Sequence, residues 1–226
     1  MSEQFAGRAF VVRVDDESVH AASSTLADDL HVLADAKVRP IVVAPDPAGA
    51  REIVRTVNRS ANVAVALSGS DAALLPQSQA GGIGNVQPAL LLTLTEAGYI
   101  PVIEPTAFAV FAADDALVAA DEVASAVASA VDAVRAIFFH TAGGVADPAT
   151  LQLIDELTPA EALALARDPA LPADLRAAVR AAAFGVRAGV AAAQIVDGRI
   201  AHAAIVELIT ARHVGTQVSG SIYFAA

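Results

Sequence analysis

The sequence has 226 residues, no cysteine, a formal net charge of −11, and 55% hydrophobic against 17% charged residues. This composition supplies a large apolar core and excludes a disordered chain, and the lack of cysteine excludes disulfides, thiolate metal ligands and thiol nucleophiles. The negative charge excludes nucleic acid and anionic membrane surfaces as partners, because both require a cationic protein surface.

We expect a cytoplasmic protein. No apolar run approaches the ~18 residues that a membrane span needs. The first residues, Met1 to Gln4, lack the basic segment before an apolar one that is typical of a signal peptide. The five histidines do not have the spacing of metal ligands, so we expect no metal site.

Short apolar stretches alternate with segments of helical periodicity along the chain. Strands are expected at residues 10–14, 40–44, 62–67, 100–103 and 136–140, and helices at 23–36, 49–57, 88–97, 117–134 and 173–186. A further helix begins at Thr158-Pro159-Ala160-Glu161, which combines a capping box with proline at the first helical position. Apolar strands that alternate with helices indicate a mainly parallel sheet covered on both faces. The prediction is an α/β protein, a three-layer α/β/α sandwich in one domain over residues 1–226.

The C-terminal stretch from Ala193 to Val218 predicts a strand, an Asp-Gly turn, a helix and another strand. Its order, VDGR-x-x-HA-x-x-x-E-x-x-T-x-x-x-x-GT, resembles the C-terminal end of the acetylglutamate kinases in the amino-acid kinase family. Further segments resemble that family in the same order along the chain. These are LSGSDAALL at 67–75, GIGNV at 82–86, GYIPVIEP at 98–105, AADEVA at 119–124 and FHTAGGVAD at 139–147.

This resemblance implies the amino-acid kinase fold, with residues 1–110 on the substrate side and residues 111–226 on the nucleotide side. It implies MgATP as the cosubstrate of an active member and a homodimer as the assembly. A small carboxylate or a nucleotide is the expected class of ligand.

The residues that should handle phosphate depart from the family pattern. The family places glycine pairs after its first two strands, because only glycine lets backbone amides come so close to a phosphate. This chain has Asp15-Asp16 after the first strand and Ala44-Pro45-Asp46-Pro47 after the second. Arg13 stands where the family has its first lysine. By our alignment the second lysine corresponds to Ala178, with Arg176 and Arg180 nearby.

The resemblance makes Arg13 and Asp121 the candidate catalytic residues. The candidate residues for binding substrate or nucleotide are Gly69, Asp71, His140, Gly143, Gly144, Arg176 and Arg180. For several of these residues a purely structural interpretation is the alternative. Arg13 would pair with Asp15 or Asp16 at the end of its strand, and Asp121 would be a carboxylate at a helix start. Gly69 and Asp71 would form a turn, and His140 would be a hydrogen-bonded structural residue.

Two functions follow. The chain is either a relative of the acetylglutamate kinases that has lost efficient phosphoryl transfer and acts as a small-molecule-binding or regulatory subunit beside a partner enzyme, or an active kinase. The active kinase would phosphorylate the carboxylate of N-acetylglutamate or a related acyl amino acid, with arginines in place of lysines. No cofactor is implied under the first reading, and MgATP under the second.

Overall fold

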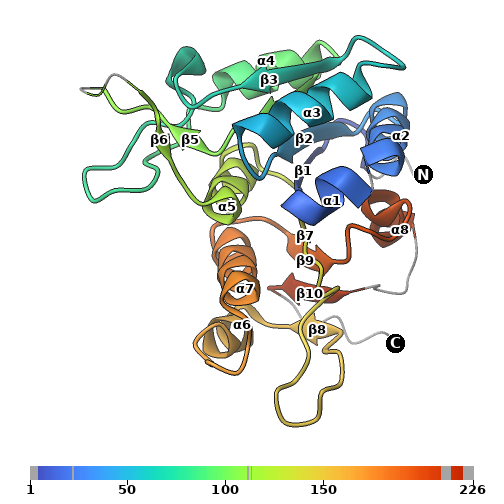
Figure 1. Ribbon diagram of the computed structural model, residues 1–226, viewed down its shortest axis with the longest axis vertical. Helices are drawn as coiled ribbons and strands as arrows, with labels where there is room; N and C mark the ends of the chain where they lie inside the picture. The colour runs from blue at the N-terminus through green and yellow to red at the C-terminus, as the bar shows by residue number, and fades with distance from the viewer. Residues whose placement is uncertain (1–4, 22, 111, 113, 210–214, 221–226) are drawn as a thin grey trace.

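The computed structural model describes residues 5–21, 23–110, 112, 114–209 and 215–220. Its centre is one eight-stranded sheet with the strand order β3-β4-β2-β1-β7-β9-β10-β8 (Figure 1). The strands are β1 (Ala9–Arg13), β2 (Arg39–Val43), β3 (Ala64–Leu67), β4 (Ile100–Ile103), β7 (Arg135–Phe139), β8 (Glu156–Leu157), β9 (Ala192–Val196) and β10 (Thr216–Ser219). Neighbouring strands are parallel except for β9 and β10, which are antiparallel.

Helices cover both faces of this sheet. They are α1 (Asp16–Ala21), α2 (Ser23–Asp35), α3 (Pro47–Val57), α4 (Ala89–Glu96), α5 (Ala120–Ala130), α6 (Pro159–Leu165), α7 (Ala173–Arg187) and α8 (Ala203–Ile209). The longest of these, α7, has 15 residues, and no helix in the described part of the chain is long and apolar enough to cross a membrane.

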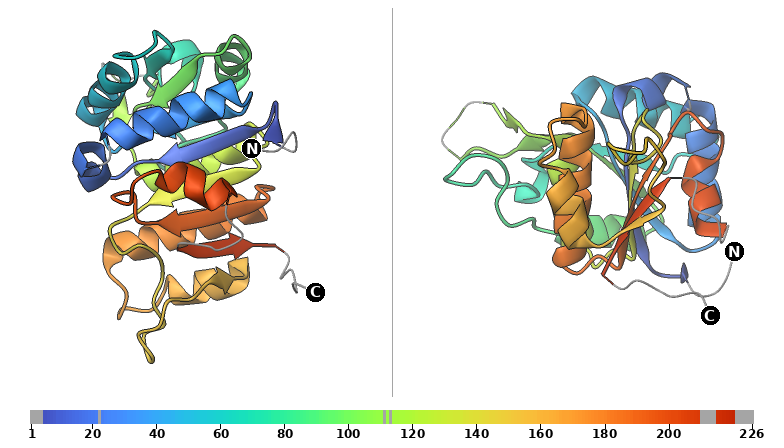
Figure 2. Two further views of the ribbon diagram at one scale, coloured as in Figure 1. Left: turned by 90° about the vertical axis from the view of Figure 1, so that its right-hand side faces the viewer. Right: turned by 90° about the horizontal axis from the view of Figure 1, so that it is seen from below.

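The two faces of the sheet carry separate cores because successive strand residues point to opposite sides. Val11 of β1 packs in the core beneath α4, α5, α6 and α7. Its neighbour Val12 packs in the core beneath α1, α2, α3 and α8. Figure 2 shows the resulting helix–sheet–helix layers from two sides. The predicted α/β/α sandwich with a mainly parallel sheet is confirmed.

Some local features differ from the prediction. The helix expected at 117–134 is shorter, because Leu117 belongs to β6 (Ala116–Leu117) and the helix ends at Ala130. Asp132 lies beyond that end with φ of 49°, a left-handed conformation that cannot continue a helix. The small hairpin of β5 (Thr106–Ala107) with β6, the short helix α1 and the short strand β8 were not expected, because two to six residues carry too little periodicity.

The centre of the sheet defines where a ligand would collect. The chain leaves β1 to form β2 on one side, and β7 enters later on the other side. In an open parallel sheet, such a reversal of strand order leaves a crevice at the carboxyl ends of the two strands, and ligands bind there. We call the space at the carboxyl ends of β1 and β7 the switch-point crevice.

The Asp-Gly turn after β9 packs tightly against this region. A side-chain Cβ on Gly198 would overlap the ring of Phe139 and the hydroxyl of Ser18. We therefore expect Gly198→Ala to lower the free energy of unfolding by about 1–3 kcal/mol, as overpacking does. Gly220→Ala is the control, because a Cβ there would lie 4.0 Å from Val186, an ordinary contact. Urea denaturation of both variants measures the difference, and equal stabilities would contradict the packing argument.

Candidate functional site

Arg13 ties together the elements that meet at the switch-point crevice. Its Nε lies 2.8 Å from Oδ1 of Asp121, which belongs to the first turn of α5. Its Nη1 donates a hydrogen bond of 3.4 Å to the carbonyl of Phe139 at the end of β7. The ion-pair partner of Arg13 is thus Asp121, and the alternative expectation of a pair with Asp15 or Asp16 is wrong. The structure brings together the two residues predicted to be catalytic.

Asp121 is largely buried, and its environment disfavours the charged carboxylate. Burial raises its pKa, and the nearby Asp15 and Asp174 carboxylates act in the same direction. Arg13, and to a lesser degree His140, lower the pKa by attraction but do not offset the burial. The Asp121 carboxyl therefore titrates above the usual aspartate range.

His140 follows β7 and is buried in the crevice. Its Nδ1 accepts a hydrogen bond of 3.0 Å from the backbone N–H of Ala142. In the neutral ring the proton is therefore on Nε2, which lies 3.3 Å from Oδ2 of Asp174 in the first turn of α7. The plainer reading of His140 as a hydrogen-bonded structural residue agrees with these contacts.

Asp174 is a residue of the candidate site that the sequence analysis missed, and it contacts His140. Its pKa is lowered, chiefly by the backbone N–H of Leu175 and also by His140. Ala178, which our alignment equated with the second lysine, is buried one turn further along α7. The signal that could have identified Asp174 is its place at the start of a helix, where the first turn points toward the carboxyl edge of the sheet.

The two loops where the family resemblance implies glycine pairs are each closed by an aspartate in this chain. Asp15 Oδ1 accepts a hydrogen bond of 2.8 Å from the backbone N–H of Ser18 at the start of α1. Asp46 Oδ1 accepts one of 2.6 Å from the backbone N–H of Gly49, and Asp46 is the N-cap of α3. Amides at a helix start are the groups that bind an external anion. Here the chain's own carboxylates occupy one of them in each loop.

Gly143 and Gly144 shape the loop after His140. Both have positive φ, 70° and 146°, and a Cβ on Gly144 would crowd Thr216 and Leu153. The Thr216 hydroxyl accepts from the N–H of Val145 at 2.7 Å and donates to the carbonyl of Ile154 at 2.7 Å. These glycines therefore fit the loop against β10, at the carboxyl side of the crevice.

Gly69 and Asp71 lie away from the crevice, after the edge strand β3. Oδ2 of Asp71 accepts from the backbone N–H of Ser68 at 2.7 Å, and the N–H of Gly69 donates to Thr106 Oγ1 at 2.9 Å. Both β4 and β2 separate this turn from β1. The structure does not bring these two predicted binding residues together with Arg13, and their contacts are those of a turn.

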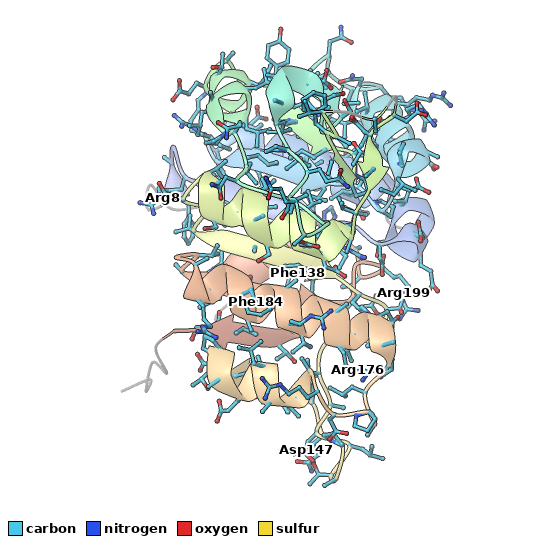
Figure 3. All side chains as sticks on the ribbon, turned by 90° about the vertical axis from the view of Figure 1, so that its left-hand side faces the viewer. Arg8, Phe138, Asp147, Arg176, Phe184 and Arg199 are labelled. Atoms are coloured by element: carbon cyan, nitrogen blue, oxygen red, sulfur yellow. The ribbon has the colours of Figure 1, made fainter. Side chains whose placement is uncertain are left out.

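The two arginines of α7 occupy different surroundings. Arg180 is exposed and lines a groove beside α5. Arg176 is half-buried near the start of α7, and Figure 3 shows it apart from Phe184, which lies further along the same helix. Within the described ranges, no group of three or more histidine, aspartate or glutamate side chains could hold a metal ion.

Comparison with known proteins identifies the class to which this fold belongs. The model of the amino acid kinase family matches residues 48–197, about two thirds of the chain, and the chain belongs to this family. Within it the chain is acetylglutamate kinase-like. It is 34% identical over 189 residues to the acetylglutamate kinase of Nostoc sp. and 33% identical over 192 residues to that of Corynebacterium urealyticum. Each alignment covers 76% of this chain and 61% of the relative, so the chain spans about three fifths of the length of these relatives.

Solved structures share the fold at low sequence identity. The N-acetylglutamate synthase of Neisseria gonorrhoeae, complexed with coenzyme A and N-acetyl-glutamate, superposes with a TM-score of 0.82 at 17% identity, covering 97% of this chain and 61% of that one. The carbamate kinase of Giardia lamblia, bound to AMP-PNP, superposes with a TM-score of 0.69 at 14% identity, covering 96% and 99%.

The Arg13–Asp121 pair predicts a measurable titration. We expect Arg13→Gln to raise the pKa of Asp121 further, because the substitution removes the nearest opposite charge from a buried carboxyl. A folded pKa above the unfolded value makes the free energy of unfolding fall as the pH rises between the two values, and Arg13→Gln extends this interval upward. Carbon NMR of the Asp121 carboxyl measures the shift. Arg51→Gln on α3 is the control, and an unchanged pKa in Arg13→Gln would refute the assignment.

Proposed function

We propose that this acetylglutamate kinase-like protein transfers phosphate inefficiently and acts as a small-molecule-binding or regulatory subunit. The observation that carries the proposal is the pair of aspartate caps. Where the family resemblance implies glycine pairs, Asp15 and Asp46 accept hydrogen bonds from the amides at the starts of α1 and α3. A phosphate group would compete with these carboxylates for the amides and would meet their negative charge.

The charges of the crevice support the same proposal. Phosphoryl transfer needs cations placed against the charge that develops on the transferred group. Arg13 is engaged by Asp121, and both Asp15 and Asp174 act on the same carboxyl. Three carboxyl groups, those of Asp121, Asp15 and Asp174, thus lie around the one guanidinium of Arg13, so this region of the crevice is a poor site for a nucleoside triphosphate.

The relatives favour a second candidate function. Both curated relatives described above carry the name acetylglutamate kinase at 33–34% identity. Arginine is a good partner for phosphate, and Arg13 stands at the carboxyl end of β1 where the family has a lysine. Under this second proposal the chain is an ATP-dependent kinase that acts on the carboxylate of an acyl amino acid.

Phosphoryl transfer itself distinguishes the two candidates. The protein is incubated with MgATP and N-acetylglutamate, and any acyl phosphate is trapped with hydroxylamine. The first proposal predicts no hydroxamate above the enzyme-free background and no MgATP binding at sub-millimolar concentration by calorimetry. Clear binding followed by hydroxamate formation would overturn it in favour of the active kinase.

A charge substitution tests the electrostatic reason. We expect Asp174→Lys to increase MgATP affinity about tenfold. A unit charge at ~8 Å contributes about 2 kcal/mol at an effective dielectric of ~20, and the 73% exposure of the Asp174 side chain reduces this through solvent screening. Asp28→Lys on the exposed side of α2 makes the same change of net charge away from the crevice and is the control. Equal affinities in the two variants would contradict the role given to Asp174.

We further propose a cytoplasmic homodimer, with a partner enzyme as the second possible assembly. The family resemblance supports the homodimer. Sedimentation equilibrium of the purified chain tests it, and a monomer at micromolar concentration would refute it.

A further inference from the structure

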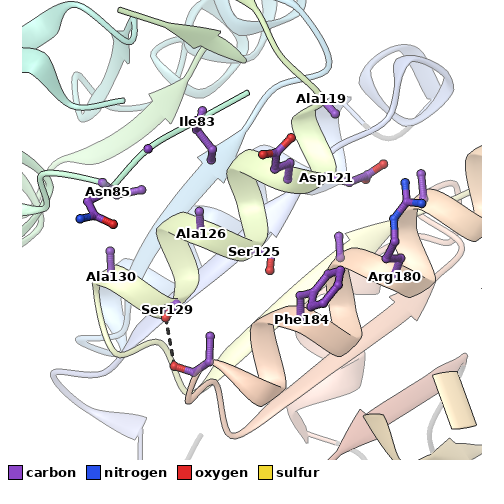
Figure 4. Close-up of a pocket in the computed structure, with 16 residues that line it drawn as sticks. Ile83, Asn85, Ala119, Asp121, Ser125, Ala126, Ser129, Ala130, Arg180 and Phe184 are labelled. Atoms are coloured by element: carbon purple, nitrogen blue, oxygen red, sulfur yellow. Dashed lines mark hydrogen bonds between the residues drawn. The ribbon is translucent and has the colours of Figure 1, made fainter. Parts of the chain in front are cut away.

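A groove of about 670 Å³ lies over α5, on the face of the sheet that α4, α5, α6 and α7 cover. The outer face of α5 forms its floor, residues 83–86 form one wall and α7 forms the other (Figure 4). Its volume lies in the range of sites that bind small molecules. It meets the switch-point crevice only at Asp121, and nothing in the proposed function assigns a role to the rest of it.

Small residues keep the groove open. The floor and the α7 wall present alanines, among them Ala126, Ala130 and Ala181. The two helices approach closely because Gly185 packs against Ser125, where an added Cβ would lie 3.2 Å from the hydroxyl. The far end is closed by a hydrogen bond of 3.0 Å from the Ser129 hydroxyl to the carbonyl of Ala188.

Two opposite charges line the groove. Arg180 is on the α7 wall and Glu122 is on the floor, both exposed. Among the residues that the structure describes, neither forms an ion pair, although Arg13, Arg39 and Arg199 all do. Figure 4 shows Arg180 and Asp121 near one end of the groove, but the Asp121 carboxylate is already engaged by Arg13. The groove therefore presents one guanidinium and one carboxylate that lie outside the ion pairs of the described residues.

Most of the other side chains that line the groove are apolar, and the polar ones are Asn85, Ser125 and Ser129. The ring of Phe184 is 50% exposed and faces the alanines of the groove. Ile83 and Val86 line the opposite wall. A ligand that covered Phe184 would gain the free energy of burying apolar surface.

We propose that this groove binds a zwitterionic α-amino acid with an apolar side chain. Its carboxylate would pair with Arg180, its ammonium group with Glu122, and its side chain would lie over Ala126 against Phe184. This assignment rests on the proposed ligand-binding role and gives that role a site and a ligand class. The bidentate geometry of arginine suits a carboxylate, and the carboxylate on the floor disfavours ligands that carry negative charge alone.

Three related ligands test the charge requirement by calorimetry. L-Phenylalanine carries both charges, 3-phenylpropanoate lacks the ammonium group and phenethylamine lacks the carboxylate. We expect L-phenylalanine to bind with a dissociation constant below about 1 mM and each of the other two to bind at least about tenfold more weakly. Equal binding of all three, or no binding of L-phenylalanine at about 10 mM, would overturn the proposal.

Matched variants locate the site. We expect Arg180→Gln and Ala126→Leu each to weaken L-phenylalanine binding at least about tenfold, the first by removing the cation and the second by filling the floor. Arg187→Gln removes an exposed arginine from the same helix outside the groove and should leave binding unchanged. All three substitutions are on half-buried or exposed positions, and thermal unfolding checks that the fold is intact. Binding that survives both groove variants would place the ligand elsewhere and refute the proposal.

The test of L-phenylalanine binding and the test of phosphoryl transfer can each contradict their own proposal without contradicting the other. Binding of L-phenylalanine is measured without MgATP and hydroxamate formation without L-phenylalanine, so each result can be obtained whatever the other shows. Hydroxamate formation, conversely, would refute the inefficient transfer of phosphate and leave the binding of L-phenylalanine to be measured separately.

Discussion

The ion pair between Arg13 and Asp121 is the interaction on which the centre of this structure depends. It joins the end of β1 to the start of α5, and the second hydrogen bond of Arg13 reaches the end of β7. Because Asp121 is buried, removing Arg13 would leave a buried carboxyl without its main counter-charge, which is costly. In this pair Asp121 engages the guanidinium of Arg13, which is the cation that a phosphate would need. A contact that holds the crevice together therefore also limits the chemistry available in it.

At the starts of the helices around the crevice, carboxylates of the chain itself also occupy groups that could bind an anionic ligand. Helix starts attract anions because their amides lack partners within the helix. In this chain Asp15 and Asp46 supply the anions for α1 and α3, and Asp174 holds an amide of α7 while it contacts His140. These carboxylates accept hydrogen bonds from helix-start amides, so those amides are already occupied by groups of the chain itself. This is the physical basis for separating the fold of the amino acid kinase family, which the chain has, from the phosphate chemistry, which we propose it performs inefficiently.

Helix α5 connects two compartments of different character. Its first turn presents Asp121 to the crevice, while its outer face forms the floor of the groove. Ligand binding in the groove would lie against the helix whose start holds Arg13.

The sequence by itself determined the alternation of strands and helices, the three layers, the family and the choice of Arg13 and Asp121 as candidates, because periodicity and short motifs are local properties of a chain. It could not assign partners. Arg13 contacts residues more than 100 positions away, and His140 meets Asp174 from a different helix. Short elements such as α1 and β8, and the early end of α5, also depended on packing rather than periodicity. The groove exists only because the fold brings residues 83–86, α5 and α7 together. Tertiary structure decided these features because charge pairing and concavity are properties of surfaces that distant segments share.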